Sequence, residues 1–216
     1  MKRATDTTRL EAFSDGVFAI AITLLILEIK VPTAAELERG GGLWPALAHR
    51  WPSYVGYVLS FLIIGIMWAN HHALFDYIRR VDRRLIFANL LLLMGVGFLP
   101  FPTAVLAEHL ADAETRTSAA VFYGATLAGI ALAFNAVWWV GIRGRGLLGT
   151  SLDEAGVRTI TRRYALGPVS YAAATAVALV NVWMSLAMHF ALALLYARSE
   201  RRDPESDRPA LLQDPS

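Results

Sequence analysis

The segment YALGPVSYAAATAVALVNVWMSLAMHFALALLYA, residues 164–197, contains 34 consecutive positions without Asp, Glu, Lys or Arg. A single helix needs only about 20 apolar residues to cross the ~30 Å hydrocarbon layer of a bilayer. The segment is therefore too long for one span, and we predict two short helices with a tight turn near Leu179–Val182. This division decides whether the number of spans is odd or even.

Residues 164–197 are the longest of several apolar blocks in the chain. Of its 216 residues, 56% are hydrophobic and 18% are charged, which is too apolar for an ordinary soluble domain. The blocks are continuous and do not alternate with period two, which excludes a membrane β-barrel. We predict an all-α integral membrane protein with six transmembrane helices per subunit. The predicted spans are Gly16–Leu27 with its flanks, Tyr54–Ala73, Leu85–Ala107, Ser118–Ile142, Tyr164–Leu179 and Val182–Tyr196.

The basic residues support an even number of spans. With six helices, one side of the membrane carries 16 Lys and Arg residues and the other side carries 4. The positive-inside rule then places both termini in the cytoplasm. With five helices, the Lys and Arg residues would not show this asymmetry between the two sides of the membrane. We expect a multi-pass protein of the cell membrane with one transmembrane domain, residues 1–200. Residues 201–216, which hold three prolines among mixed charges, are predicted to form a disordered cytoplasmic tail.

Several other features limit the chemistry. The chain has no cysteine, so disulfides, thiolate metal sites and iron–sulfur clusters are impossible. Its net charge of +2 could suggest nucleic acid, but basic residues in a membrane protein usually report topology. Pro100 and Pro102 predict a break or kink in the third span near its outer end.

The first predicted span is unusually short. Only twelve uncharged residues, Gly16–Leu27, separate Asp15 from Glu28. Ionisable groups so near the hydrocarbon usually face protein or water, which favours a helix sheltered inside an assembly. The alternative is a thin, tilted helix whose Glu28 and Lys30 reach the interface.

The residues before this span form a compact polar motif. Arg9 and Asp15 lie six positions apart, about 240° around a helix, so we expect each to bond to another helix. A simple N-cap formed by Ser14 or Asp15 is the alternative.

The motif Arg9-x-x-x-Phe13-Ser14-Asp15, followed by Gly16-Val17-Phe18-Ala19-Ile20-Ala21-Ile22-Thr23-Leu24-Leu25, resembles the signature of one protein family. This is the prokaryotic branch of the lysosomal potassium channel family, transmembrane protein 175. Trp68-Ala69-Asn70-His71-His72 and Phe98-Leu99-Pro100-Phe101-Pro102-Thr103 are similar to that family as well. The resemblance covers at least residues 9–109 and implies a tetramer of six-helix subunits, with helix one lining a potassium-selective central pore.

The resemblance also marks pore residues. It implies that Ile20 is the pore isoleucine and that Thr23 is a pore-facing threonine. Leu24 and Leu27 extend the same constriction. Ile20, Leu24 and Leu27 lie at i, i+4 and i+7, and four such stripes would form an apolar ring that gates by dewetting. Two alternatives stay open: ordinary helix packing for the stripe, and a hydrogen bond from Thr23 to the Ala19 carbonyl.

The remaining signature residues have a structural role by resemblance. They form an inter-helix polar network that holds the pore helix, and its members are Arg9, Phe13, Ser14, Asp15, Trp68 and His71. A zinc site at His71 and His72 is an alternative that makes a more specific claim about function. Adjacent histidines point about 100° apart on a helix, however, and no third ligand has a suitable spacing. We therefore predict neither a metal site nor a cofactor.

Three function classes follow from these residues. The first is a homotetrameric potassium channel whose partners are its own copies, membrane lipids and potassium ions, and not nucleic acid. The second is a weakly selective cation or proton leak through the same pore, since no Thr-Val-Gly-Tyr-Gly filter is present. The third is an intramembrane enzyme, which we disfavour because no Cys, Gly-x-Ser-x-Gly or His-Glu-x-x-His motif occurs.

Overall fold

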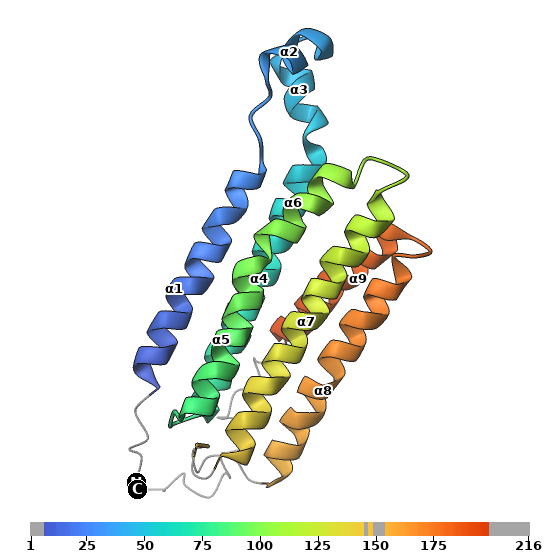
Figure 1. Cartoon of the computed structure of the whole chain (residues 1–216). Coiled ribbons are helices and arrows are strands. Elements are labelled where there is room, and N and C mark those ends of the chain that lie inside the picture. The colour runs from blue at the N-terminus through green and yellow to red at the C-terminus, as the bar shows by residue number, and fades with distance from the viewer. Residues whose placement is uncertain (1–6, 145–146, 149–153, 199–216) are drawn as a thin grey trace, which may run out of the picture.

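The structure of the chain is a computed structural model that describes residues 7–144, 147–148 and 154–198. In these residues every regular element is helical, and an isolated β-bridge joins Ile78 to Leu148. Figure 1 shows the long helices side by side, with α2 (Ala34–Gly40) and α3 (Leu43–His49) projecting beyond one end. The prediction of an all-α fold is confirmed, while the predicted tail, residues 201–216, lies outside the described residues.

The helices follow one another with short connections. Their bounds are α1 (Thr8–Leu24), continued by the 3-10 turn η1 (Leu25–Glu28), α2 (Ala34–Gly40), α3 (Leu43–His49), α4 (Trp51–Tyr77), α5 (Arg83–Phe98), α6 (Pro100–His109), α7 (Arg116–Arg143), α8 (Glu154–Val177) and α9 (Val182–Arg198).

Among the described residues, four segments are long and apolar enough to cross a membrane. They are Thr8–Glu28, Trp51–Tyr77, Arg83–His109 and Arg116–Arg143. α9 contains a shorter apolar helix, Val182–Tyr196, and α8 carries several charges in its first half. All six predicted spans are therefore helical, four of them have membrane length and composition, and the count of six spans stays a prediction.

Residues 164–197 form two helices, as predicted. α8 ends at Val177, α9 begins at Val182, and the Asn181 side chain accepts the N–H of Met184 at 3.0 Å. α8 extends beyond the predicted span, because the helix begins at Glu154, ten residues before Tyr164. A run without charges marks the apolar part of a helix, whereas the helix itself continues into polar sequence.

The two prolines divide the third long segment, also as predicted. α5 ends at Phe98 and α6 begins at Pro100. Because proline has no backbone N–H, Pro100 cannot donate a hydrogen bond, and the N–H of Leu99 donates to the Val96 carbonyl at 3.2 Å. Leu99, Pro100 and Pro102 are all buried, so the break lies inside the protein, where neighbouring groups can satisfy the backbone.

α7 is the central helix of the bundle. It packs against α5, α6, α8 and α9 and carries two of the largest fully buried side chains, Tyr123 and Trp138. Trp138 Nε1 donates to Thr161 Oγ1 at 2.9 Å, and its ring stacks on Tyr164. α1, in contrast, lies at an edge and packs mainly against α4 and α5 (Figure 1).

A chain of buried hydroxyls joins α7, α4 and α6. Thr103 donates its only proton to the Leu99 carbonyl at 2.8 Å. It must therefore accept from Ser60 at 2.7 Å, and Ser60 in turn accepts from Tyr123 at 3.0 Å. Each hydroxyl donates once in the same direction, so three helices are joined without leaving an unpaired proton in the apolar interior.

α7 approaches its neighbours most closely at Gly124. A Cβ atom at this position would collide with Thr175 Oγ1 and come within 3.0 Å of the His189 imidazole. Both neighbours are held in place: Thr175 donates to the Tyr171 carbonyl at 2.7 Å, and His189 Nδ1 bonds to the Ser185 carbonyl at 2.8 Å. The absence of a side chain is therefore required here.

We predict that Gly124→Ala lowers the free energy of unfolding by about 1–3 kcal/mol, the usual cost of forcing extra atoms into a packed core. Gly129→Ala is the matched control, because a Cβ on that α7 residue meets no atom within 4 Å. Thermal unfolding of both purified variants in detergent would measure the difference. Equal melting temperatures would contradict the close approach.

Candidate pore face and the polar network behind it

α1 has one buried face and one exposed face. The buried residues of α1 and η1 recur at i, i+4, i+7 and i+11, and they are Ser14, Phe18, Ala21 and Leu25. This stripe faces α4 and α5, the helices against which α1 packs. The predicted constriction residues lie on the other side of the helix.

The side chains of Ile20, Leu24 and Leu27 are exposed in the single chain. The exposed fractions of these side chains are 60%, 41% and 61%. The stripe therefore does not pack inside the subunit, and ordinary packing against a helix of another copy remains the alternative. Exposure alone does not select a pore face, since Ile26 is 52% exposed as well. The role of the stripe as a constriction stays a prediction.

Thr23 forms the local bonds that the sequence left as an alternative. Its hydroxyl donates toward the Ala19 carbonyl at 3.0 Å and the Ile20 carbonyl at 2.9 Å. The proton is thus held by the helix itself. Because the side chain is exposed, the oxygen lone pairs remain available to a ligand outside the subunit.

One buried amide on α5 connects α1 to α4. Asn89 Nδ2 donates to Ser14 Oγ at 2.9 Å, and Asn89 Oδ1 lies 2.9 Å from His71 Nε2. Ser14 gives its own proton to the Leu10 carbonyl, so it accepts from Asn89. The Asn89 oxygen is an acceptor, which assigns the His71 proton to Nε2. All three side chains are buried, and Asn89 therefore ties three helices together.

A second bond joins α1 to α4 closer to the surface. Trp68 Nε1 donates to Asp15 Oδ1 at 2.9 Å, and both side chains are exposed in the single chain. The structure thus brings Asp15 and Trp68 together, as well as Ser14 and His71 through Asn89. The N-cap alternative for Ser14 and Asp15 is wrong, because α1 already begins at Thr8.

Arg9 and Phe13 lie away from this network. Both are exposed, and Arg9 forms no hydrogen bond or ion pair with any described residue. They precede Ile20 by eleven and seven residues, about three and two helical turns, so they share its open face. Within one subunit, the predicted network therefore does not include Arg9 or Phe13, because the helical period turns them outward.

Asn89 is the functional residue that the sequence interpretation missed. The available signal was a single amide inside the apolar run Ile86–Leu93. A polar side chain in such a run needs a partner on another helix. That partner, His71, also packs its ring against Phe18 and Phe75, with centroid distances of 5.4 and 4.6 Å.

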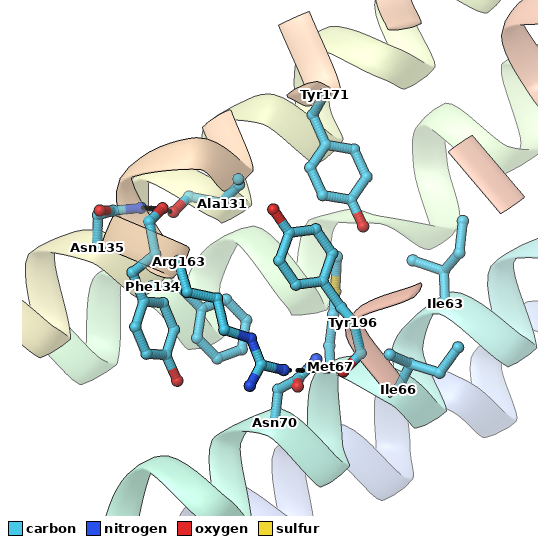
Figure 2. Close-up of a pocket in the computed structure, with 12 residues that line it drawn as sticks. Ile63, Ile66, Met67, Asn70, Ala131, Phe134, Asn135, Arg163, Tyr171 and Tyr196 are labelled. Atoms are coloured by element: carbon cyan, nitrogen blue, oxygen red, sulfur yellow. Dashed lines mark hydrogen bonds between the residues drawn. The ribbon is translucent and has the colours of Figure 1, made fainter. Parts of the chain in front are cut away.

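A separate cavity of about 70 Å³ lies between α4, α7, α8 and α9 (Figure 2). The Tyr171 and Tyr196 rings, stacked at 6.3 Å, form one wall, and Ile63 forms part of another. Arg163 reaches the cavity from α8 and donates to the Tyr196 carbonyl at 3.0 Å. No α1 residue lines this cavity, so it is distinct from the candidate pore face.

The fold and this site define a class of protein. It is a multi-span helical membrane protein whose first helix is hydrogen-bonded to its neighbours on one face and exposed on the other. The family model for the endosomal/lysosomal potassium channel TMEM175 matches residues 9–100. A potassium channel of Streptomyces collinus is 48% identical over 205 residues, which cover 95% of this chain and 98% of that protein. The human endosomal/lysosomal proton channel TMEM175 is 36% identical over 134 residues, covering 57% of this chain and 27% of that protein.

A solved structure agrees with these sequence matches. The crystal structure of a lysosomal potassium-selective channel TMEM175 homolog from Chamaesiphon minutus superposes with a TM-score of 0.78 at 42% identity. The match covers 89% of this chain and 97% of that chain. The chain belongs to the TMEM175 family.

We predict that Asn89→Ala destabilises the protein by roughly 1–3 kcal/mol, because it leaves the buried Nε2–H of His71 without an acceptor. Asn70→Ala on α4 is the matched control, since the half-buried side chain of Asn70 forms no hydrogen bond with any described residue. Chemical unfolding of both variants in detergent would measure the two losses. An Asn89→Ala variant as stable as the control would remove the amide from its structural role.

Proposed function

We propose that four copies of this chain form a potassium channel whose pore is lined by α1. The observation that carries the proposal is the open apolar stripe of Ile20, Leu24 and Leu27 on a helix whose opposite face is bonded to α4 and α5. A membrane helix anchored in this way presents its free face to something outside the subunit. The bacterial relatives named potassium channels support potassium as the ion.

The stripe would control conduction by withholding ligands from the ion. Four Ile20 side chains around an axis would form a ring without polar atoms. A narrow ring of this kind offers an ion nothing in place of its hydration shell, and it can close by dewetting. Leu24 and Leu27 would lengthen the constriction, and the free lone pairs of Thr23 would contact an ion beside it.

The Asn89 network would set the rotation of the pore helix. One residue of slippage turns an α-helix by about 100°, which would move Ile20 off the axis. The bonds of Ser14 and Asp15 to other helices oppose this rotation. Arg9 and Phe13, on the open face, would contact the neighbouring copies.

We also propose six spans with both termini in the cytoplasm of the cell membrane. The distribution of 16 basic residues on one side and 4 on the other supports this topology. The α8–α9 hairpin, which runs beside α7 in Figure 1, would provide the last two crossings.

Single cysteines should map this topology, because the chain has none of its own. We predict that Trp44→Cys, at an 80% exposed position before α4, reacts with a membrane-impermeant maleimide added to intact cells. Arg80→Cys, after α4, should react only once the cells are permeabilised. Labelling of Arg80→Cys in intact cells would overturn the orientation.

A weakly selective cation or proton leak is the second candidate. Thr23 holds its proton within its own helix, and the rest of the stripe is apolar, so few groups on this face discriminate between ions. The human relative is named a proton channel. Liposome flux under potassium, sodium and proton gradients would separate the two candidates by the relative rates.

The proposed channel needs no cofactor and no resident metal. Its partners would be three further copies of the chain, membrane lipids and the permeant potassium ions. The family consists of ion channels, so an enzymatic reaction is not part of the proposal.

The sharpest prediction concerns Ile20→Asn. A polar side chain in the ring would lower the barrier to a hydrated ion, and a barrier lower by about 1.4 kcal/mol raises flux about tenfold. The variant should also discriminate less between potassium and sodium. Ile26→Asn is the matched control, because Ile26 is also exposed but lies in η1, off the stripe of Ile20, Leu24 and Leu27, and should change flux little.

Liposome flux and single-channel recordings on the purified wild type and both variants would measure these effects. The mass of each assembly would be checked by light scattering. If the Ile20→Asn protein stays tetrameric with unchanged conductance and selectivity, Ile20 does not lie on the ion pathway.

A further inference from the structure

Four arginines cluster at one end of the bundle, two in the connection between α4 and α5 and two in the first turn of α5. We call residues 79–84 the arginine loop, and its cations are Arg79, Arg80, Arg83 and Arg84. All four side chains are exposed, and none has a carboxylate within ion-pair distance in the part of the chain that the structure describes. The carboxylate of Asp82, inside the loop, instead accepts the N–H of Leu85 at 2.8 Å.

The arginine loop has a defined conformation. Ile78 and Val81 are buried, with exposed fractions of 0% and 6%, and anchor the loop in the bundle. The backbone N–H groups of Arg79 and Arg80 donate to the Leu147 carbonyl at 2.8 and 3.3 Å. The apolar residues are thus directed inward and the guanidinium groups outward, so the cluster of unpaired charge is part of the fold.

The loop borders a hollow at the start of α5. Asp82, Arg83, Arg84 and Phe87 line a cavity of about 380 Å³. The Arg83 guanidinium lies 5.6 Å from the centroid of the Phe87 ring, a cation–π distance that holds it over the aromatic face. The Arg83 guanidinium therefore meets an exposed aromatic ring in this hollow, which Arg84 also lines.

An apolar stripe continues from this hollow along α5. It consists of Phe87, Leu90, Met94 and Phe98, at i, i+3, i+7 and i+11, with exposed fractions of 57%, 39%, 66% and 45%. Eleven residues of helix span about 16 Å, close to the depth of one leaflet of a ~30 Å hydrocarbon layer. We call this set the α5 stripe. Cations at one end and a leaflet-long apolar surface below them match the two parts of a phospholipid.

We propose that the arginine loop and the α5 stripe bind an anionic phospholipid. Arg83 and Arg84 hold the phosphate, since the planar guanidinium fork matches phosphate oxygens. One acyl chain lies along the α5 stripe. The unpaired positive charge selects anionic over zwitterionic headgroups. The proposal needs only membrane embedding and does not depend on the pore.

The test measures binding of phosphatidylglycerol to the purified protein in detergent by native mass spectrometry, with phosphatidylcholine of the same chains as reference. Each basic residue near an anionic headgroup contributes about fivefold in affinity, so R83Q/R84Q should bind phosphatidylglycerol about thirtyfold more weakly. R83K/R84K keeps the charge but loses the planar forks, so it should bind phosphatidylglycerol more weakly than the wild type and more tightly than R83Q/R84Q. R158Q/R162Q on α8 is the matched control, with the same loss of charge on another helix, and should bind as the wild type does.

Three outcomes would overturn the proposal. An equal loss in R158Q/R162Q would mean unspecific attraction to surface charge. Displacement of the lipid by glycerol phosphate at equal concentration would mean a site for free anions. Dissociation of the assembly in F87A/M94A would mean that the α5 stripe is an interface between copies, whereas the proposal expects weaker lipid binding at unchanged assembly mass.

Discussion

Polar groups inside this bundle cannot form hydrogen bonds to water, so they must pair with one another. The arrangement of α1 depends on this pairing. Among the described residues, every buried side-chain nitrogen or oxygen has a hydrogen-bond partner. Asn89 shows the consequence most clearly, because its amide donates to Ser14 on α1 and accepts from His71 on α4. An unpaired amide in apolar surroundings would raise the free energy of the folded state. The two hydrogen bonds of Asn89 therefore fix the rotation of α1 against its neighbours.

The same constraint shapes the rest of the interior. The hydroxyl chain from Tyr123 through Ser60 to Thr103 ends on a backbone carbonyl, and the break at Pro100 is buried among packed side chains. Close contact at Gly124 brings α7 against the held side chains of α8 and α9. The central helix is thus bonded on several sides, whereas α1 is bonded on one side only. This difference is the structural basis for the proposal that α1 lines the pore.

Outside the bundle, the chain uses interactions typical of water-exposed segments. Thr33 and Glu36 form a capping box at the start of α2, and Arg50 pairs with Glu36 at 2.8 Å. Hydrogen bonds from Thr33, together with the Arg50 guanidinium, hold the pKa of Glu36 below its usual value. Charges at the other end of the bundle, in the arginine loop, have no ion-pair partner among the described residues, which is the basis for proposing an anionic lipid there. The two ends therefore differ in what they can bind.

Features that depend on local composition could be predicted from the residues alone. The length of residues 164–197 required two helices, the missing N–H of proline required a break near Pro100, and the spacing of Ile20, Leu24 and Leu27 placed them on one side of a helix. The start of α8 was not predictable in this way, because helices extend beyond their apolar part. Helix packing was needed to show which side of α1 is covered, that Arg9 and Phe13 lie on the exposed side, and that Asn89 joins Ser14 and His71. These contacts link residues 75 and 18 positions apart, and such pairs depend on how whole helices pack, which no local pattern encodes.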